Sequence, residues 1–437
     1  MTDNQCRKEY SMLKERIEFL CRKKNLSRKE LVDGLVTPAH FANILADRYP
    51  LAEDLAEQIA GRLGVNPSYL LRVAAEDEET LATADKIFTE LSKLANPATE
   101  SYVDLLEDRN DSLVVEMTTY LMKAVYYQQL NDPTAYEYLH QTYLNFYLEK
   151  FGRSDEVELP APLKKAILFY KIQYFRSINH YYDVLNNVTQ LSRLVEEGTE
   201  NWLNAQNIMM EACIQVKQFD QAKQVFEQTM RRVYDDRLFH RLTGLYVAYS
   251  GYCFAMGSVQ EALLTLSMAE ANLVYLENAS DMLTTILNNR IIMLTSIGEL
   301  DKALEEVGRF EALVSRERDE MQQMMLPVTL IYRCEIAFMR KNWGLLSQHL
   351  DQLRKTNLTT DQQMGLDFYE SQLALAQGNQ DVFWMHALQC LPYFEALQHP
   401  ARLEQLYETL AVVSEDSRRY KESSAYYRKL VYLLRKK

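Results

Sequence analysis

GELDKAL at residues 298–304 joins a glycine turn to the start of a helix, and the chain repeats this pattern. Six more copies occur at residues 180–185, 217–222, 257–262, 341–346, 378–383 and 418–423. The last residues of successive copies lie 37, 40, 41, 43, 37 and 40 positions apart, and residues 131–135 look like an earlier, divergent copy. This period predicts a pair of antiparallel helices in each unit. Because one pair cannot bury its own apolar face, we expect the pairs to stack.

The last position of each copy is expected to face a neighbouring helix, where a small residue allows close packing. Four copies carry a small residue there and three do not: Ala222, Ala262, Ala303 and Ser423 against Leu185, Leu346 and Phe383. We therefore expect the last three to be weaker copies of the repeat.

The composition favours an all-α fold. Of 437 residues only 13 are Gly and 10 are Pro, while 47% are hydrophobic and 25% are charged. Such a chain can fold around a core and contains few residues that break helices. Its length exceeds one ordinary core and predicts several units or an extended array.

The segment at residues 298–304 resembles the tetratricopeptide repeat, although a period near 40 instead of about 34 marks degenerate copies. The resemblance implies a right-handed superhelix of helical hairpins, in which the first helix of each pair lines a concave groove. It implies that these polar residues bind a ligand there: Tyr170, Gln173, Arg176, Asn204, Asn207, Glu211, Asn288, Tyr332, Glu335 and Gln372.

An elongated groove suits an extended peptide of roughly five to ten residues better than a compact metabolite. The side chains of Asn204, Asn207 and Asn288 offer a donor and an acceptor together, so they can bind peptide amides. Arg176 can pair with a carboxylate. The acidic surroundings favour a peptide with a basic residue. The alternative is that these residues are only solvated polar side chains on the array.

Helix start and stop signals are clear near the N-terminus. Ser27 with Glu30 three residues later is typical of a capping box. Thr37 followed by Pro38 combines an N-cap oxygen with a proline at the first helical position, and Gly64 ends a later helix. We expect helices over about residues 10–24, from residue 28, over 37–46, over 51–63 and from 67.

The two helices that begin near Ser27 and Thr37 predict a helix-turn-helix, whose second helix enters the major groove. On that helix Asn43 can read adenine and His40 can donate to a base or a phosphate, while Ala39 and Ala42 also face outward. Cations that start the preceding helix can reach the phosphates. The predicted DNA-binding residues are Arg28, Lys29, Thr37, Ala39, His40 and Asn43.

LSRKELVDGLVTPAHFANIL, followed by LAEDLAEQIAGRLGVNPSYLL, resembles the lambda-repressor-like, or XRE-type, helix-turn-helix family. The matching positions are Leu26, Ser27, Leu31, Ile44, Leu55, Ile59, Ala60, Leu63, Gly64 and Val65. The family often has Ile-Glu-x-Gly after the reading helix, whereas residues 44–47 are ILAD. The alternative is a helical bundle that only packs on the rest of the chain or caps a dimer.

The charge is unevenly distributed. Residues 1–73 hold 12 Lys/Arg against 10 Asp/Glu, a net +2, while the remaining residues hold 36 against 51, a net −15. This distribution permits DNA binding by the N-terminal segment and argues against indiscriminate nucleic-acid binding by the whole chain.

The sequence contains no pattern of a catalytic or metal site. It has no phosphate-binding glycine loop, no His/Cys zinc spacing and no G-x-S-x-G. We therefore predict no enzyme, no cofactor and no metal. Six cysteines without a CxxC pair predict reduced, mostly buried thiols. The absence of a long apolar run or a signal peptide predicts a cytoplasmic protein that does not bind a membrane.

An XRE-type domain followed by seven or eight tetratricopeptide-like repeats resembles the RRNPP family of peptide-sensing regulators, with NprR-like or arbitrium-receptor-like architecture. The resemblance implies a DNA-binding domain at residues 1–73, a helical linker at 74–98 and a repeat domain at 99–437 that binds a short signalling peptide and forms a homodimer. It implies a transcription regulator that binds a double-stranded DNA operator. The alternative is a repeat protein that binds or inhibits another regulatory protein, such as a response regulator.

Overall fold

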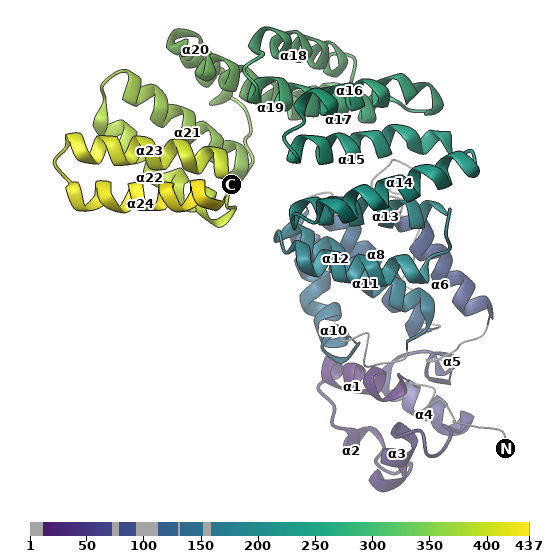
Figure 1. The fold of residues 1–437 in the computed structure, drawn as a ribbon. Helices are drawn as coiled ribbons and strands as arrows, with labels where there is room; N and C mark the ends of the chain where they lie inside the picture. Colours follow the sequence, from purple (N-terminus) through teal and green to yellow (C-terminus); the bar gives the residue numbers. More distant parts are fainter. Residues whose placement is uncertain (1–11, 72–77, 93–111, 130–131, 152–158, 437) are drawn as a thin grey trace. The chain divides into compact units, whose positions relative to one another are not determined.

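The computed structural model describes residues 12–71, 78–92, 112–129, 132–151 and 159–436 (Figure 1). Helices and short turns account for these residues, and no strand occurs among them. The chain divides into two compact units, Met1–Arg232 and Val233–Lys437. Each unit is described by itself below.

The first unit begins with five short helices: α1 (Leu13–Lys24), α2 (Arg28–Leu31), α3 (Pro38–Leu45), α4 (Glu53–Leu63) and α5 (Pro67–Leu71). The predicted end signals are confirmed. Ser27 and Glu30 form both hydrogen bonds of the capping box, and the Thr37 hydroxyl accepts from the N–H of His40 at 3.2 Å. Gly64 ends α4 in the left-handed conformation, with φ of 67°.

The turn between α2 and α3 is held by a side chain from α4. The Arg62 guanidinium donates to the carbonyl oxygens of Leu31 at 2.7 Å, Asp33 at 2.8 Å and Glu30 at 3.2 Å. Leu31 is the last residue of α2 and Asp33 follows it, so Arg62 supplies donors to carbonyls where the helix ends; the Glu30 carbonyl also accepts from the Asp33 N–H at 3.4 Å. The turn then reverses at Gly34, with φ of 74°.

The other described helices that begin in the first unit are α6 (Glu78–Leu91), α8 (Leu113–Gln129), α9 (Pro133–Leu139), the π-helical turn η1 (His140–Leu144), α10 (Asn145–Phe151), α11 (Ala161–Ser177), α12 (Tyr181–Leu194), α13 (Glu200–Gln215) and α14 (Phe219–Asp235). Within the predicted linker at residues 74–98, the described residues form α6, which packs against α8 and α11. The Phe88 and Phe169 rings meet edge to face at 6.1 Å between centroids.

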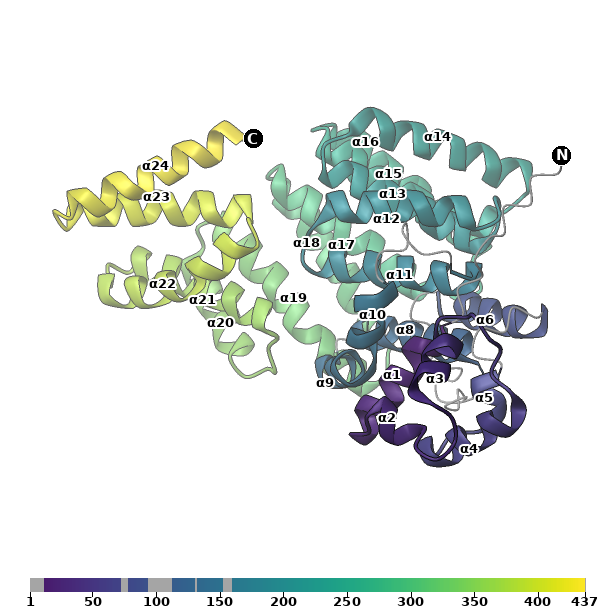
Figure 2. The ribbon, with the colours of Figure 1, turned by 90° about the horizontal axis from the view of Figure 1, so that it is seen from below.

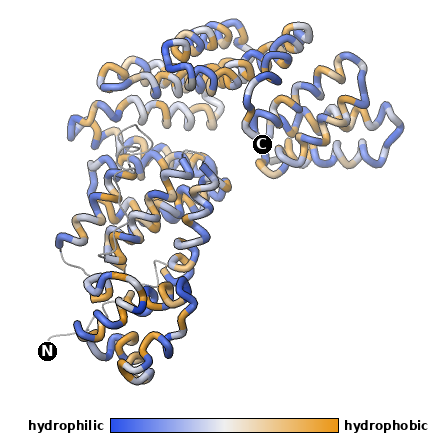
Figure 3. Tube along the Cα trace, turned by 180° about the vertical axis from the view of Figure 1, so that it is seen from behind, coloured by the Kyte–Doolittle hydropathy of each residue, from blue (hydrophilic) through white to orange (hydrophobic). Residues whose placement is uncertain are grey.

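The second unit contains five helical hairpins. Its elements are η2 (Phe239–Arg241), α15 (Leu242–Ala255), α16 (Val259–Ala271), η3 (Asn272–Tyr275), α17 (Ser280–Ser296), α18 (Leu300–Val314), α19 (Asp319–Met339), α20 (Trp343–Leu353), α21 (Thr360–Ala376), α22 (Gln380–Ala396), α23 (Pro400–Asp416) and α24 (Tyr420–Lys436). The two helices of a hairpin lie side by side, as α23 and α24 do (Figure 2). Polar and apolar residues alternate along the helices, as expected for amphipathic helices that pack on one face (Figure 3).

All seven predicted repeat turns join two helices of a hairpin. In each turn one residue takes the left-handed conformation, and these residues are Asn179, Lys217, Gly257, Gly298, Lys341, Gly378 and Arg418. The next N–H bonds back to the preceding helix, as Ser258 does to the Cys253 carbonyl at 2.9 Å. This is the Schellman arrangement that closes a helix C-terminus.

The first of the seven turns has a different register from the predicted one. The left-handed residue is Asn179, so the position equivalent to Ala222 is Val184 and not Leu185. Val184 is fully buried, whereas Leu185 is only half-buried. No glycine marks this turn, and Asn tolerates the left-handed conformation in its place.

Candidate functional site

The predicted reading helix α3 keeps its polar face in solvent. Phe41 and two further apolar residues bury the inner face, while Ala39, His40 and Ala42 are exposed and Asn43 is half-buried. The His40 ring stacks on Tyr49 at 5.5 Å between centroids. The outward orientation of this face is therefore as predicted, whereas contact with DNA stays a prediction.

Arg48 lies beside this face and was missed by sequence reasoning. Its Nη1 donates to Asn43 Oδ1 at 3.1 Å, and its backbone N–H bonds to the Asn43 carbonyl at 2.9 Å. The left-handed residue Asp47 turns the chain back at this point, with φ of 55°. The sequence signal that could have identified Arg48 is a basic residue directly after the reading helix.

The predicted phosphate-contacting cations lie at the start of α2. Arg28 forms an ion pair with Glu18 of α1, and Glu18 also lies 3.8 Å from Lys150 of α10. Lys29 is exposed. Arg28 contacts Glu18 through Nη2 and its side chain is 46% exposed, so its other N–H groups can still donate to a phosphate.

In the first unit, three of the predicted peptide-binding residues form one cluster between α11 and α13. Arg176 donates to both Glu211 carboxylate oxygens, at 2.8 and 3.3 Å, and to Gln173 Oε1 at 3.1 Å. The Tyr181 hydroxyl also reaches Glu211, at 3.4 Å. Arg176 and Glu211 are part-exposed, so the cluster presents both charges to solvent.

The other predicted residues of this unit have separate partners. Tyr170 is buried, and its hydroxyl bonds Tyr136 at 2.9 Å and His140 Nδ1 at 2.7 Å. Burial raises the pKa of Tyr170 above its ordinary value. Asn204 reaches the Ser92 carbonyl at 3.4 Å, and Asn207 is half-buried on α13.

In the second unit, Glu335 is the centre of a larger cluster. It accepts hydrogen bonds from Tyr369 and from Arg402, the latter at 2.6 Å. The Arg402 guanidinium lies over the Phe368 ring at 4.3 Å. Burial acts to lower the pKa of Arg402, but Tyr369 and Glu335 raise it, so Arg402 stays charged. Arg402 lies 67 residues from Glu335 in the chain, and no sequence signal connects them.

The remaining predicted residues of the second unit have other hydrogen-bond partners. Tyr332 donates to Asn288, and Gln372 is buried with Ser371 as its acceptor at 3.2 Å. The predicted residues thus form clusters within each unit. A single groove that includes both sets stays a prediction.

A buried network joins the N-terminal helices to the helices that follow. Arg16 of α1 pairs with Glu116 of α8 at 3.1 Å and donates to the Tyr147 hydroxyl of α10 at 3.2 Å. The Arg16 guanidinium lies over the Tyr69 ring of α5 at 4.3 Å, and the Tyr69 hydroxyl donates to Glu116. Arg16 and Glu116 are only 3% and 6% exposed, so water competes little for these contacts.

Burial has opposite consequences for the two charges of this network. It raises the pKa of Glu116 above the ordinary value, although Arg16 and Tyr69 act to lower it. For Arg16, burial acts to lower the pKa, but the effects of Tyr69, Tyr147 and Glu116 are larger together. The pKa of Arg16 is therefore raised above its ordinary value. The sequence held one signal of this site: Arg16 lies on the apolar face of α1, next to Ile17 and one turn from Leu20.

The described part of the chain contains no group of three or more His, Cys, Asp or Glu that could hold a metal ion. Five cysteines are free and buried, as predicted, while Cys6 lies outside the described residues. Across the described ranges, the helices are too short or too polar to cross a bilayer.

No family model matches the sequence, and neither does any curated protein. Solved structures do match the fold. A Rap protein complexed with Competence and Sporulation Factor aligns with a TM-score of 0.57 and 14% identity, covering 82% of this chain and 99% of that chain. The chain shares the fold of this Rap protein. Aspartyl phosphate phosphatase F from Bacillus subtilis aligns with a TM-score of 0.51 and 13% identity, covering 81% and 93%.

These similarities confirm the predicted all-α class with tetratricopeptide-like hairpins. They also confirm, at the level of the fold, the resemblance to the RRNPP-type regulators. At this identity they concern the fold alone.

Proposed function

We propose that the chain is a DNA-binding transcription regulator controlled by a short signalling peptide. In this proposal residues 1–73 bind a double-stranded operator, and residues 99–437 bind the peptide and form the homodimer. Residues 74–98 form a helical linker between these two domains. The protein acts in the cytoplasm and catalyses no reaction. The observation that carries the proposal is the capped, outward-facing helix α3 in a chain that shares the fold of a Rap protein over 82% of its length.

The DNA-binding part rests on shape and chemistry. Helix α3 is anchored by Thr37 at its start, and its exposed side chains lie on a bundle whose turn is fixed by Arg62. A helix held this rigidly can present His40 and Asn43 to base edges. Arg48, hydrogen-bonded to Asn43, adds a cation beside the same face.

The peptide-binding part rests on the polar clusters of the hairpins. Arg176 with Glu211, and Arg402 with Glu335, each offer a cation and a carboxylate that a peptide's own charges and amides can engage. The Rap protein of similar fold was crystallised with a Competence and Sporulation Factor, which is consistent with a signalling ligand here.

The test begins with selection of genomic fragments that the full chain binds, with and without culture supernatant. The affinity for the selected DNA is then measured for the wild-type chain and for the double variant His40→Ala with Asn43→Ala. We expect each lost base contact to reduce specific affinity by about 1–3 kcal/mol. His180→Ala, an exposed histidine on a repeat turn, is the matched control. Unchanged binding by the double variant would contradict the proposed role of α3.

A second candidate function is binding to another regulatory protein through the repeats. It is favoured by the similarity in fold to a protein named aspartyl phosphate phosphatase F. Affinity capture from the native cell separates the two candidates. A response regulator retained by residues 99–437 in the absence of DNA supports the second candidate.

A further inference from the structure

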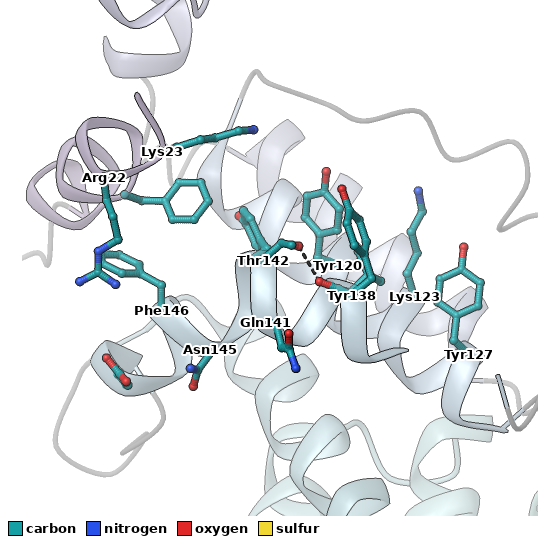
Figure 4. A pocket seen from close by; sticks show the side chains of 14 residues that line it. Arg22, Lys23, Tyr120, Lys123, Tyr127, Tyr138, Gln141, Thr142, Asn145 and Phe146 are labelled. Atoms are coloured by element: carbon teal, nitrogen blue, oxygen red, sulfur yellow. Dashed lines mark hydrogen bonds between the residues drawn. The ribbon is translucent and has the colours of Figure 1, made fainter. Parts of the chain in front are cut away.

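A hollow of about 660 Å³ lies in the first unit between α1 and the segment formed by α8, α9, η1 and α10 (Figure 4). Two hollows in the second unit measure about 430 and 220 Å³. Pockets that bind small organic molecules measure about 300–1,000 Å³. The hollow is therefore large enough for a ligand of nucleotide size, and none of the predicted DNA- or peptide-binding residues lines it.

Aromatic side chains form much of the wall: Phe19, Tyr120, Tyr127, Tyr138, Tyr143 and Phe146. Part of this set is a connected cluster, since Tyr143 lies 4.4 Å from Tyr120 and 5.2 Å from Phe19, between ring centroids. Tyr138 is different because it is 68% exposed and still lines the hollow. An exposed ring beside packed rings offers a surface on which a flat ligand can stack.

The charge of the wall contrasts with that of the chain. Arg22, Lys23 and Lys123 line the hollow against one carboxylate, Glu149, although the whole chain carries a net charge of −13. Arg22 lies over the Phe146 ring at 4.8 Å, which holds its guanidinium at one end of the hollow (Figure 4). Within the described residues, neither Arg22 nor Lys23 forms an ion pair. This end therefore favours an anion.

The wall also contains residues of the π-helical turn η1, at His140–Leu144. Such a turn inserts one extra residue per turn into a helix and occurs often at functional sites. Here its residues Gln141, Thr142 and Tyr143 all line the hollow. Gln141 and Thr142 add an amide and a hydroxyl group; their hydrogens bond Glu137 at 2.8 Å and the Tyr138 carbonyl at 2.6 Å, and their oxygen atoms can still accept a hydrogen bond.

We propose that this hollow binds a small aromatic anion, a molecule that joins a flat ring to a phosphate or carboxylate group. The ring stacks among the tyrosines, with Tyr138 as its exposed partner. The anionic group binds Arg22 and Lys23. The site does not depend on peptide binding or on DNA binding.

Calorimetry on the full chain tests the proposal with two aromatic anions, adenosine monophosphate and indole-3-carboxylate. Adenosine supplies a ring without the charge, and inorganic phosphate supplies the charge without a ring. Binding of adenosine monophosphate alone identifies a nucleoside phosphate as the source, and binding of indole-3-carboxylate alone identifies an aromatic acid. Both results require that adenosine and phosphate bind at least tenfold more weakly. If neither aromatic anion binds, the proposal is wrong.

Variants locate the bound molecule. Arg22→Gln with Lys23→Gln is expected to weaken binding at least about tenfold, because it removes two charged partners. Tyr138→Ala is expected to weaken it about fivefold or more through lost stacking. Lys14→Gln with Lys24→Gln is the matched control, since both lysines are exposed on α1 and neither lines the hollow. Equal losses in the two double variants would overturn the proposal, as would undiminished binding in the first.

Discussion

At the scale of single residues, the Arg16–Glu116 pair stabilises the contact between the N-terminal helices and α8. Each partner is nearly inaccessible to water, so removal of one leaves the other as an uncompensated buried charge. Sequence reasoning could identify Arg16 only as a charge on an apolar face. Its partner lies 100 positions away on another helix, and only the packed structure brings the two together.

We therefore expect strong coupling between substitutions at these two positions. Arg16→Met and Glu116→Leu should each lower the free energy of unfolding by about 3–5 kcal/mol. The double variant should cost clearly less than the sum, because it leaves no unpaired charge, although Tyr69 and Tyr147 each lose a hydrogen-bond partner. Urea denaturation of the four proteins measures the cycle. Additive losses would mean that the ion pair does not stabilise this contact.

Two histidines of the second unit give stability a dependence on pH. Burial lowers the pKa of His399, with Arg402 adding to the effect, and burial also lowers the pKa of His349. The unfolded chain then binds protons more readily than the folded chain, so stability is present above the ordinary histidine pKa of about 6.5 and is lost as the pH falls below it. The urea concentration at the midpoint of unfolding should decrease as the pH is lowered from 8 to 5. His349→Gln with His399→Gln should flatten the decrease, and an unchanged slope would contradict this assignment.

At the scale of elements, the repeated hairpin turn was the most predictable feature. Its signal is local, because a left-handed residue and a helix start lie within six positions. The register failed only at the turn of Asn179, although Lys217, Lys341 and Arg418 also hold the left-handed position without a glycine. The polar clusters were less predictable: the sequence identified Arg176 and Glu211 as inward-facing, but not that they bind each other across α11 and α13.

The turn geometry predicts opposite effects for two substitutions. Gly257 has φ of 76°, and an added Cβ would meet no atom within 4 Å, so Gly257→Ala tests backbone strain alone. It should lower the free energy of unfolding by about 1 kcal/mol. At the equivalent position of another turn, Lys341 has φ of 53°, and Lys341→Gly should raise the free energy of unfolding by up to about 1 kcal/mol. Thermal denaturation measures both. A neutral Gly257→Ala would show that the left-handed turn is not strained for other residues.

At the scale of the whole molecule, charge separates the predicted DNA-binding segment from the rest. The segment carries a net +2 in a chain of −13, so in the proposed function the negative charge of DNA favours this segment over the hairpins. The Arg16 network and the aromatic contacts of Phe19 with Tyr143 and Tyr147 join this segment to α8–α10. Buried contacts therefore connect α1 with α8 and α10 of the first unit.

This connection leads to a prediction about linkage. If a peptide binds the proposed regulator and favours one arrangement of the hairpins, it must change the affinity for the operator, and the operator must change the affinity for the peptide by the same factor. We expect a factor of roughly 5 to 150, corresponding to about 1–3 kcal/mol. The measurement compares operator affinity with and without saturating peptide, and peptide affinity with and without operator.

Two variants separate the two binding events from the connection between them. Arg176→Gln should lower the affinity for the peptide. It should not change the affinity for the operator measured in the absence of peptide, because Arg176 lies on α11 and contacts Gln173 and Glu211 instead of the N-terminal helices. Arg16→Met with Glu116→Leu should retain both binding events and reduce the factor toward one, since it removes the buried connection. A factor of one in the wild-type protein would separate peptide binding from DNA binding and contradict the proposed control.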